Sequence, residues 1–286
     1  MKPTSTSQWF DADYYAHGCG APYQRDDIWL AFFRGIAGRI VQDIQPGTVL
    51  DAGCAMGFLV EALRHQKVDA FGVDVSDYAI QNVHPEIAAH CRVGSVIEPF
   101  PQQYDLIVCI EVLEHMSTRE AEQAITNFCQ YSDDILFSSS PFDYKEVTHF
   151  NVHPPEYWAE LFARHGFYRD VDFDASFITP WAVRFRRRQE PHHRLVRDYE
   201  RRFWLLWKEN YDLRELNITM RSQLVDIQRQ SQEQFQLVEQ QKSYIDAIHQ
   251  GRVWRLMGLL HRGWGGLNKM VGRGHTLVKG ILTDRS

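Results

Sequence analysis

The fold class that this 286-residue sequence predicts is α/β, with a largely parallel sheet. Apolar segments of strand length alternate with amphipathic segments of helix length over residues 46–188, which is typical of a sheet covered by helices. Residues 49–57 read V-L-D-A-G-C-A-M-G, so a strand passes through small residues directly into a helix. A second strand ends on Asp74, and two successive strands therefore each end on an acidic residue.

An N-terminal segment, residues 1–45, precedes the first strand. It begins with aromatic pairs at Trp9-Phe10 and Tyr14-Tyr15, and an amphipathic helix is predicted from about Asp27 to Asp43. We expect the aromatic residues chiefly to pack this helix onto the sheet. The alternative is that the segment caps a substrate pocket.

The first strand, Thr48 to Asp51, follows a Pro-Gly turn. Gly53 and Gly57 have no Cβ, so the backbone of the turn can approach a ligand closely. The helix after the turn, about Gly57 to His65, directs its free N–H groups at that ligand. The segment therefore predicts a nucleotide-type site.

The second strand, Ala70 to Val73, places Asp74 at its end. A carboxylate there can accept hydrogen bonds from both ribose hydroxyls of a nucleoside. Asp74 could instead cap the next helix, but Ser76 suits that role better.

The remaining elements continue the alternation. The apolar run from Tyr104 to Ile110 suits a central strand that is buried on both faces. The other predicted elements are a strand at His90–Val93, a helix at about Arg119–Tyr131, a strand at Asp134–Phe137, a helix between Pro154 and Gly166, and closing strands at Phe167–Phe173 and Trp181–Arg187.

The dinucleotide pattern G-x-G-x-x-G does not fit residues 51–57. Their pattern resembles motif I, D-x-G-x-G-x-G, of class I S-adenosylmethionine-dependent methyltransferases, with Ala55 in place of the middle glycine. The segment E-V-L-E-H at 111–115 resembles the signature that follows the fourth strand in many small-molecule and sugar methyltransferases. The resemblance covers about residues 8–188, and the tail described below extends it to bacterial surface-polysaccharide methyltransferases.

This resemblance implies a Rossmann-like, seven-stranded sheet in the order 3-2-1-4-5-7-6, with helices on both faces and the last strand antiparallel. It implies S-adenosyl-L-methionine as the cofactor of residues 46–188. Ser95 stands where the family commonly has an Asp near the adenine. The expected cofactor-binding residues are Asp51, Ala52, Gly53, Gly57, Asp74, Val75, Ser95 and Ile110.

Acidic and imidazole side chains follow the fourth and fifth strands. Methyl transfer to a hydroxyl requires removal of the hydroxyl proton, and His149, His115 and Glu111 are the candidate catalytic residues. Together with Glu114 they could instead hold a divalent cation such as Mg²⁺, as the resemblance to small-RNA 2′-O-methyltransferases implies. In a third interpretation these side chains only stabilise the local loops.

The C-terminal part has a different pattern. A heptad of mostly apolar residues runs from Val196 to Ile248 and predicts a long helix over residues 192–250 that forms a coiled coil. The partner is a second copy or another protein. Residues 251–286 form a basic amphipathic tail in which seven Lys or Arg residues accompany one acid, Asp284, and such a tail suits an anionic membrane surface.

Composition fits an ordinary globular protein, with 44% hydrophobic residues and a net charge of −6. The five cysteines show no C-x-x-C spacing, and we expect reduced thiols and a cytoplasmic protein, which the tail could bring to the inner face of the membrane.

The predicted function is O-methylation of a sugar in bacterial surface-glycan biosynthesis. Two alternatives are a metal-assisted nucleic-acid 2′-O-methyltransferase and a non-catalytic cofactor-binding scaffold. Because the domain is acidic without its tail, no nucleic-acid partner is expected.

Overall fold

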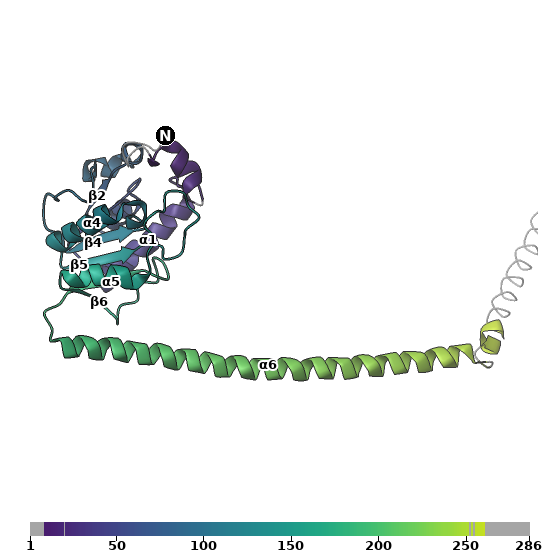
Figure 1. The fold of residues 1–286 in the computed structure, drawn as a ribbon. Helices are drawn as coiled ribbons and strands as arrows, with labels where there is room; N and C mark the ends of the chain where they lie inside the picture. Colours follow the sequence, from purple (N-terminus) through teal and green to yellow (C-terminus); the bar gives the residue numbers. More distant parts are fainter. Residues whose placement is uncertain (1–8, 20, 252, 254, 261–286) are drawn as a thin grey trace, which may run out of the picture. The chain divides into compact units, whose positions relative to one another are not determined.

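A computed structural model describes residues 9–19, 21–251, 253 and 255–260. The chain divides into two compact units, Met1–Trp204 and Leu205–Ser286. The first unit contains a seven-stranded sheet in the order β3-β2-β1-β4-β5-β7-β6, as predicted. Figure 1 labels β2, β4, β5 and β6 of this sheet. The strands are β1 Thr48–Ala52, β2 Asp69–Asp74, β3 Cys91–Val93, β4 Leu106–Ile110, β5 Asp134–Ser138, β6 Phe167–Arg169 and β7 Val183–Arg187.

Strand direction follows the prediction as well. The pairs that join β3, β2, β1, β4 and β5 are parallel, whereas β7 is antiparallel to both β5 and β6. The carboxyl ends of the five parallel strands therefore meet at one edge of the sheet. In open α/β sheets this is the edge where ligands bind.

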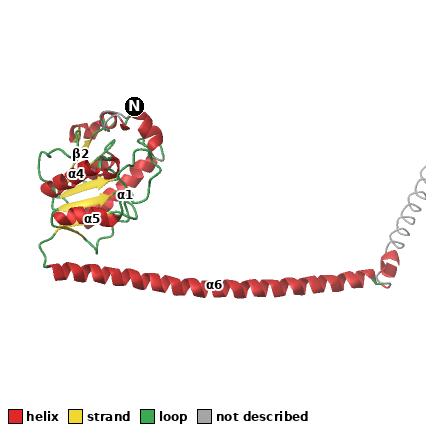
Figure 2. Ribbon diagram, viewed as in Figure 1, coloured by secondary structure: helices red, strands yellow, loops and turns green. Residues whose placement is uncertain are grey.

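Helices connect the strands (Figure 2). Side chains cap several of these helices: Asp26 accepts hydrogen bonds from two amides at the start of the helix Asp27–Asp43, and Ser76 accepts one at the start of the helix Asp77–Gln81, as expected for N-cap residues. Ser117 and Glu120 form a capping box at the start of α4. The helices of this unit are α1 Asp27–Asp43, α2 Phe58–His65, α3 Asp77–Gln81, α4 Thr118–Tyr131 and α5 Pro155–Arg164, with short turns η2 Tyr14–Gly18, η3 Pro85–His90 and η4 Leu113–His115.

Two apolar clusters cover the two faces of the sheet. Leu106 and Val108 of β4 pack in a cluster with α1 and α2, whereas Ile107 and Cys109 pack in a cluster with α4 and α5. Successive residues of a strand point to opposite faces, so β4 is buried on both sides. This confirms helices on both faces.

The closing strands are shorter than predicted. The strand expected over Phe167–Phe173 ends at Arg169, because the amide of Phe173 bonds to the carbonyl of Asp170 at 3.2 Å and forms a turn. Trp181 lies before β7, and its indole nitrogen donates to Glu111 at 2.9 Å.

The predicted long helix is α6, His192–Gln250. Its first turns contact the sheet unit, where Leu195 is buried and Arg201 pairs with Asp172 at 2.8 Å. The side chains from Glu200 to Gln250 are all exposed.

The basic tail predicted over residues 251–286 lies mostly outside the described residues. None of the described helices is apolar over enough of its length to cross a bilayer.

Candidate active site

The turn after β1 curves tightly because three of its residues have positive φ. Gly53 and Gly57 have φ values of 91° and 72°, and a Cβ on Gly53 would lie 2.3 Å from Cγ2 of Val112. Ala55 has a φ of 46°, a left-handed conformation that favours glycine. Residue 55, the middle position of the motif, therefore has the left-handed backbone conformation typical of glycine, although its side chain is a methyl group.

Asp74 at the end of β2 is tied to this turn. Its carboxylate accepts hydrogen bonds from the amides of Ala55 and Ser76, each at 2.8 Å. Burial raises the pKa of Asp74, and these amides act in the opposite direction. The carboxylate is thus held in one orientation at the edge of the cavity.

Asp51 at the end of β1 lies close to Asp74. It is almost fully buried, and burial together with the charge of Asp74 raises the pKa of Asp51 to about 8. Without a cationic group beside it, Asp51 is therefore mostly protonated at neutral pH. A cationic ligand group would favour its ionised form.

One cavity of about 710 Å³ joins the ends of β1, β2 and β4 to the loop after β5. Of the predicted cofactor-binding residues, six line it, namely Asp51, Gly53, Asp74, Val75, Ser95 and Ile110. Ala52 is instead buried in the core, and Gly57 packs against Ile87 and Cys91 at the start of α2.

Aromatic residues of the N-terminal segment form another wall of this cavity. Phe10, Tyr14, Tyr15 and Tyr23 all line it, so the expectation that they chiefly pack a helix onto the sheet was incomplete. Phe10 is held by its carbonyl, which accepts a hydrogen bond from the Ser76 hydroxyl at 2.5 Å. The aromatic segment both packs against α2 and covers the site.

Glu111 begins the loop after β4 with a φ of 53°. This conformation directs its carboxylate to Ser138 and Trp181, whose hydroxyl and indole donate to Oε1 at 2.6 and 2.9 Å. Glu111 is a lining residue, but its carboxylate is not part of the group described next.

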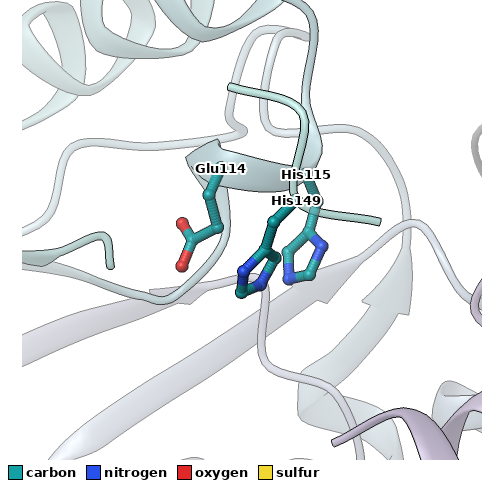
Figure 3. Close-up of side chains that lie close together, drawn as sticks. All are labelled: Glu114, His115 and His149. Carbon is teal, nitrogen blue, oxygen red and sulfur yellow. The ribbon is translucent and has the colours of Figure 1, made fainter. Parts of the chain in front are cut away.

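Glu114, His115 and His149 converge at the mouth of β4 (Figure 3). One ligand atom from each lies within 4.8 Å of the others. Oε1 of Glu114 accepts from the amide of Ser140 at 3.3 Å, whereas Oε2 is buried and has no hydrogen-bond partner in the described part of the chain. Burial and the nearby Glu111 raise the pKa of Glu114 well above its ordinary value.

Both imidazoles of this group have polar neighbours. Burial and the adjacent His149 lower the pKa of His115 to about 3, and its Nδ1 lies 3.0 Å from the hydroxyl of Thr148. Nε2 of His149 lies 3.2 Å from Glu146, and its Nδ1 lies 3.0 Å from the carbonyl of Asp143. His115 is therefore a neutral ring with a fixed orientation.

Asp143 and Glu146 are site residues that the sequence analysis missed. With His149 they form a second group whose ligand atoms lie within 4.8 Å of one another. Their three-residue spacing, D-x-x-E-x-x-H, was the available signal. Glu146 also accepts hydrogen bonds from Thr148 at 2.6 Å and from Tyr14 at 3.3 Å, which connects the aromatic wall to the imidazoles.

Comparisons with known proteins agree with this fold. The sequence model of a family described as a methyltransferase domain matches residues 24–135. Ubiquinone biosynthesis O-methyltransferase from Photorhabdus laumondii is 33% identical over 76 residues, which cover 24% of this chain and 32% of that protein. The same enzyme from Pseudomonas paraeruginosa is 30% identical over 96 residues, covering 31% of this chain and 38% of that protein. The chain thus spans about a third of the length of the curated relatives it matches.

A solved structure shares the fold at low sequence identity. Magnesium protoporphyrin IX methyltransferase from Synechocystis PCC 6803, solved with S-adenosylmethionine bound, aligns with a TM-score of 0.51 and 16% identity. The alignment covers 66% of this chain and all of that one. Residues 24–135 thus match a methyltransferase domain, and the sheet order and the motif I turn are those of the class I S-adenosylmethionine-dependent methyltransferase fold.

Proposed function

We propose that this protein transfers the methyl group of S-adenosylmethionine to a hydroxyl oxygen of a small-molecule acceptor. The observation that carries the proposal is one cavity that is lined both by Asp51 and Asp74 and by His115 and His149. A donor site and a group able to activate a hydroxyl therefore share this cavity, as transfer between two bound molecules requires.

The residues at the donor end fit S-adenosylmethionine. Asp51 offers a buried carboxyl for the ammonium of the methionine end, Asp74 an oriented carboxylate for the ribose, and Ser95 a hydroxyl on the adenine side. When bound, the cofactor supplies a methyl group on a positively charged sulfur. The chain binds and orients it, while the aromatic wall limits the access of water.

The residues at the acceptor end fit a divalent cation. Among the described residues, one buried oxygen of Glu114 has no hydrogen-bond partner, and the two imidazoles beside it add nitrogen ligands that Mg²⁺ accepts less readily than Mn²⁺ or Zn²⁺. A bound cation would lower the pKa of an acceptor hydroxyl. Without one, an imidazole of the pair would take the hydroxyl proton directly.

For the acceptor we retain a sugar hydroxyl as the first candidate. Phe142 and Trp181 line the cavity with ring centroids 5.6 Å apart, and such rings can stack on the apolar face of a sugar. A phenol of a quinone precursor is the second candidate, favoured by the similarity to ubiquinone O-methyltransferases.

A transfer assay with isotopically labelled S-adenosylmethionine tests the proposal. Nucleotide sugars, lipid-linked sugars, polyprenyl phenols and RNA are offered in separate arms, each with and without a chelator. We expect labelled methyl on a sugar or phenol, and loss of transfer in His149→Ala with cofactor binding kept. Cofactor binding without transfer to any of these acceptors would favour a non-catalytic cofactor-binding scaffold. Transfer to RNA would favour a nucleic-acid 2′-O-methyltransferase.

A further inference from the structure

The long helix α6 presents a continuous apolar column on its surface. Its residues recur at every seventh position, and each has half or more of its side-chain surface exposed. They are Leu206 at 50%, Leu213 at 56%, Met220 at 60% and Ile227 at 61%. A helix with a column of this spacing is stabilised by packing against another helix rather than by its own propensity.

A second column accompanies the first and contains two amides. Phe203 and Leu224 occupy its ends, and Asn210 and Asn217 occupy consecutive layers between them. An Asn side chain carries both donors and an acceptor, so two facing Asn residues satisfy each other. The chemistry that complements these two layers is therefore the same two layers of another copy.

We propose that α6 pairs with α6 of a second copy of this chain as a parallel, in-register, two-stranded coiled coil over residues 203–248. In this arrangement Asn210 faces Asn210 and Asn217 faces Asn217, which fixes register and the number of strands. In an antiparallel pair over the same residues, Asn210 and Asn217 would face Gln241 and Gln234 of the other column, so the charges beside the seam and the cross-linking test below decide the direction. A shift by one heptad would place Asn210 against Phe203.

Charged residues beside the seam fit the same arrangement. Glu209 and Arg214 flank it on opposite sides and are both exposed. In a parallel pair, the flanking position of one helix faces the flanking position five residues later on the other. Glu209 of each copy then faces Arg214 of its partner, and the two-fold axis repeats this pair of opposite charges.

The seam is weaker toward its C-terminal end. Ser231, Gln234 and Gln241 occupy seam positions before the apolar residues resume at Ile245 and Ile248. Tyr211, Ile218 and Val225 form another apolar column that lies outside a two-stranded seam. This column widens the apolar face, and the mass measurement below therefore tests the number of copies.

The test uses the full chain. Sedimentation equilibrium should give twice the chain mass of 33.5 kDa at micromolar concentration. Residue 231 lies at a seam position, so mild oxidation of the Ser231→Cys variant should link most of the chains as disulfide dimers. Ser222→Cys, on the outer face of the same helix, is the matched control and should link no more than the unsubstituted chain.

Three results would overturn the proposal. A monomeric mass would mean that another protein covers the column, and a trimeric mass would exclude two strands. A dimeric mass in which Ser231→Cys links no better than Ser222→Cys would exclude parallel, in-register pairing.

A seam variant separates pairing from folding. Leu213→Asp with Met220→Asp should produce a monomer, whereas Thr219→Asp with Ser222→Asp adds the same charge outside the seam and should remain dimeric. The unfolding transition of the methyltransferase domain should be unchanged in both. A dimeric seam variant would also contradict the proposal.

Discussion

The imidazole rings of His115 and His149 lie with their centroids 4.5 Å apart, although they follow two different strands of the sheet. Glu114 Oε2 lies in the same group and has no hydrogen-bond partner among the described residues. Two imidazoles and one carboxyl group are three ligands, which leave coordination positions of a cation open for an acceptor oxygen. This relationship leads to the first prediction.

Replacing Glu114 should impair transfer without impairing cofactor binding. We expect Glu114→Gln to lower kcat by about 100-fold, because an amide cannot ionise beside a cation as the Glu114 carboxyl would. The measurement is kcat as a function of added Mg²⁺ or Mn²⁺, with S-adenosylhomocysteine affinity measured in parallel. Glu122→Gln, on the exposed face of α4, is the control. If a chelator left the transfer rate unchanged, a role of the cation would be excluded. Direct removal of the hydroxyl proton by His149 would then be the remaining mechanism.

Asp51 should make cofactor binding depend on pH. Its pKa of about 8 means that, without a cationic partner, the carboxyl is mostly protonated at neutral pH, and pairing with the cofactor's ammonium requires release of that proton. Affinity for S-adenosylhomocysteine should therefore rise by up to about tenfold per pH unit between about pH 6 and about pH 8. Above that range it should level off.

Calorimetry in buffers of different ionisation enthalpy measures the released proton directly. Asp51→Asn should bind S-adenosylhomocysteine more weakly, and its affinity should depend little on pH over the same range.

The raised pKa of Asp51 should also make the stability of the protein without cofactor depend on pH. Because the folded-state pKa of Asp51 is raised, its contribution to the free energy of unfolding is lost as pH rises toward about 8. An affinity that does not change with pH would refute the role assigned to Asp51.

Local sequence signals were sufficient for most of the fold. The apolar run of β4, the acids that end β1 and β2, and the heptad of α6 each depend on residues that are neighbours in the chain. The loops were harder to predict, because tertiary contacts set their shape. Glu111 points to Ser138 and Trp181 only once β5 and β7 are in place.

The same reason explains the missed site residues. Asp143 and Glu146 reach His149 because the loop after β5 folds back toward η4, where the amides of Phe150 and Asn151 bond to the carbonyl of Glu114 at 3.1 and 3.0 Å. The D-x-x-E-x-x-H spacing could signal the local group, but neither composition nor periodicity encodes the return of this loop to η4.

Tyr14 should position the acceptor side of the site. Its hydroxyl lies 3.3 Å from Glu146, and its ring lies 6.2 Å from that of His115. We expect Tyr14→Phe to raise the acceptor KM about fivefold, corresponding to about 1 kcal/mol for one lost hydrogen bond. S-adenosylhomocysteine affinity should not change. Tyr144→Phe, on an exposed side chain, is the control, and an equal loss in both variants would contradict the assignment.

Ala55→Gly should stabilise the protein, whereas Ala52→Gly should destabilise it. Ala55 has a φ of 46°, a conformation that costs a residue with a Cβ about 1 kcal/mol, and Ala55→Gly should raise the free energy of unfolding by up to about that amount. Ala52 lies fully buried in β1, so Ala52→Gly should lower that free energy by about 1 kcal/mol. Thermal unfolding of both variants measures the difference as opposite shifts in Tm. The amide of residue 55 still donates to Asp74 in Ala55→Gly, so cofactor affinity should be retained. A loss of stability in Ala55→Gly as large as that in Ala52→Gly would show that the strain at this turn is relieved by contacts of the Ala55 methyl group.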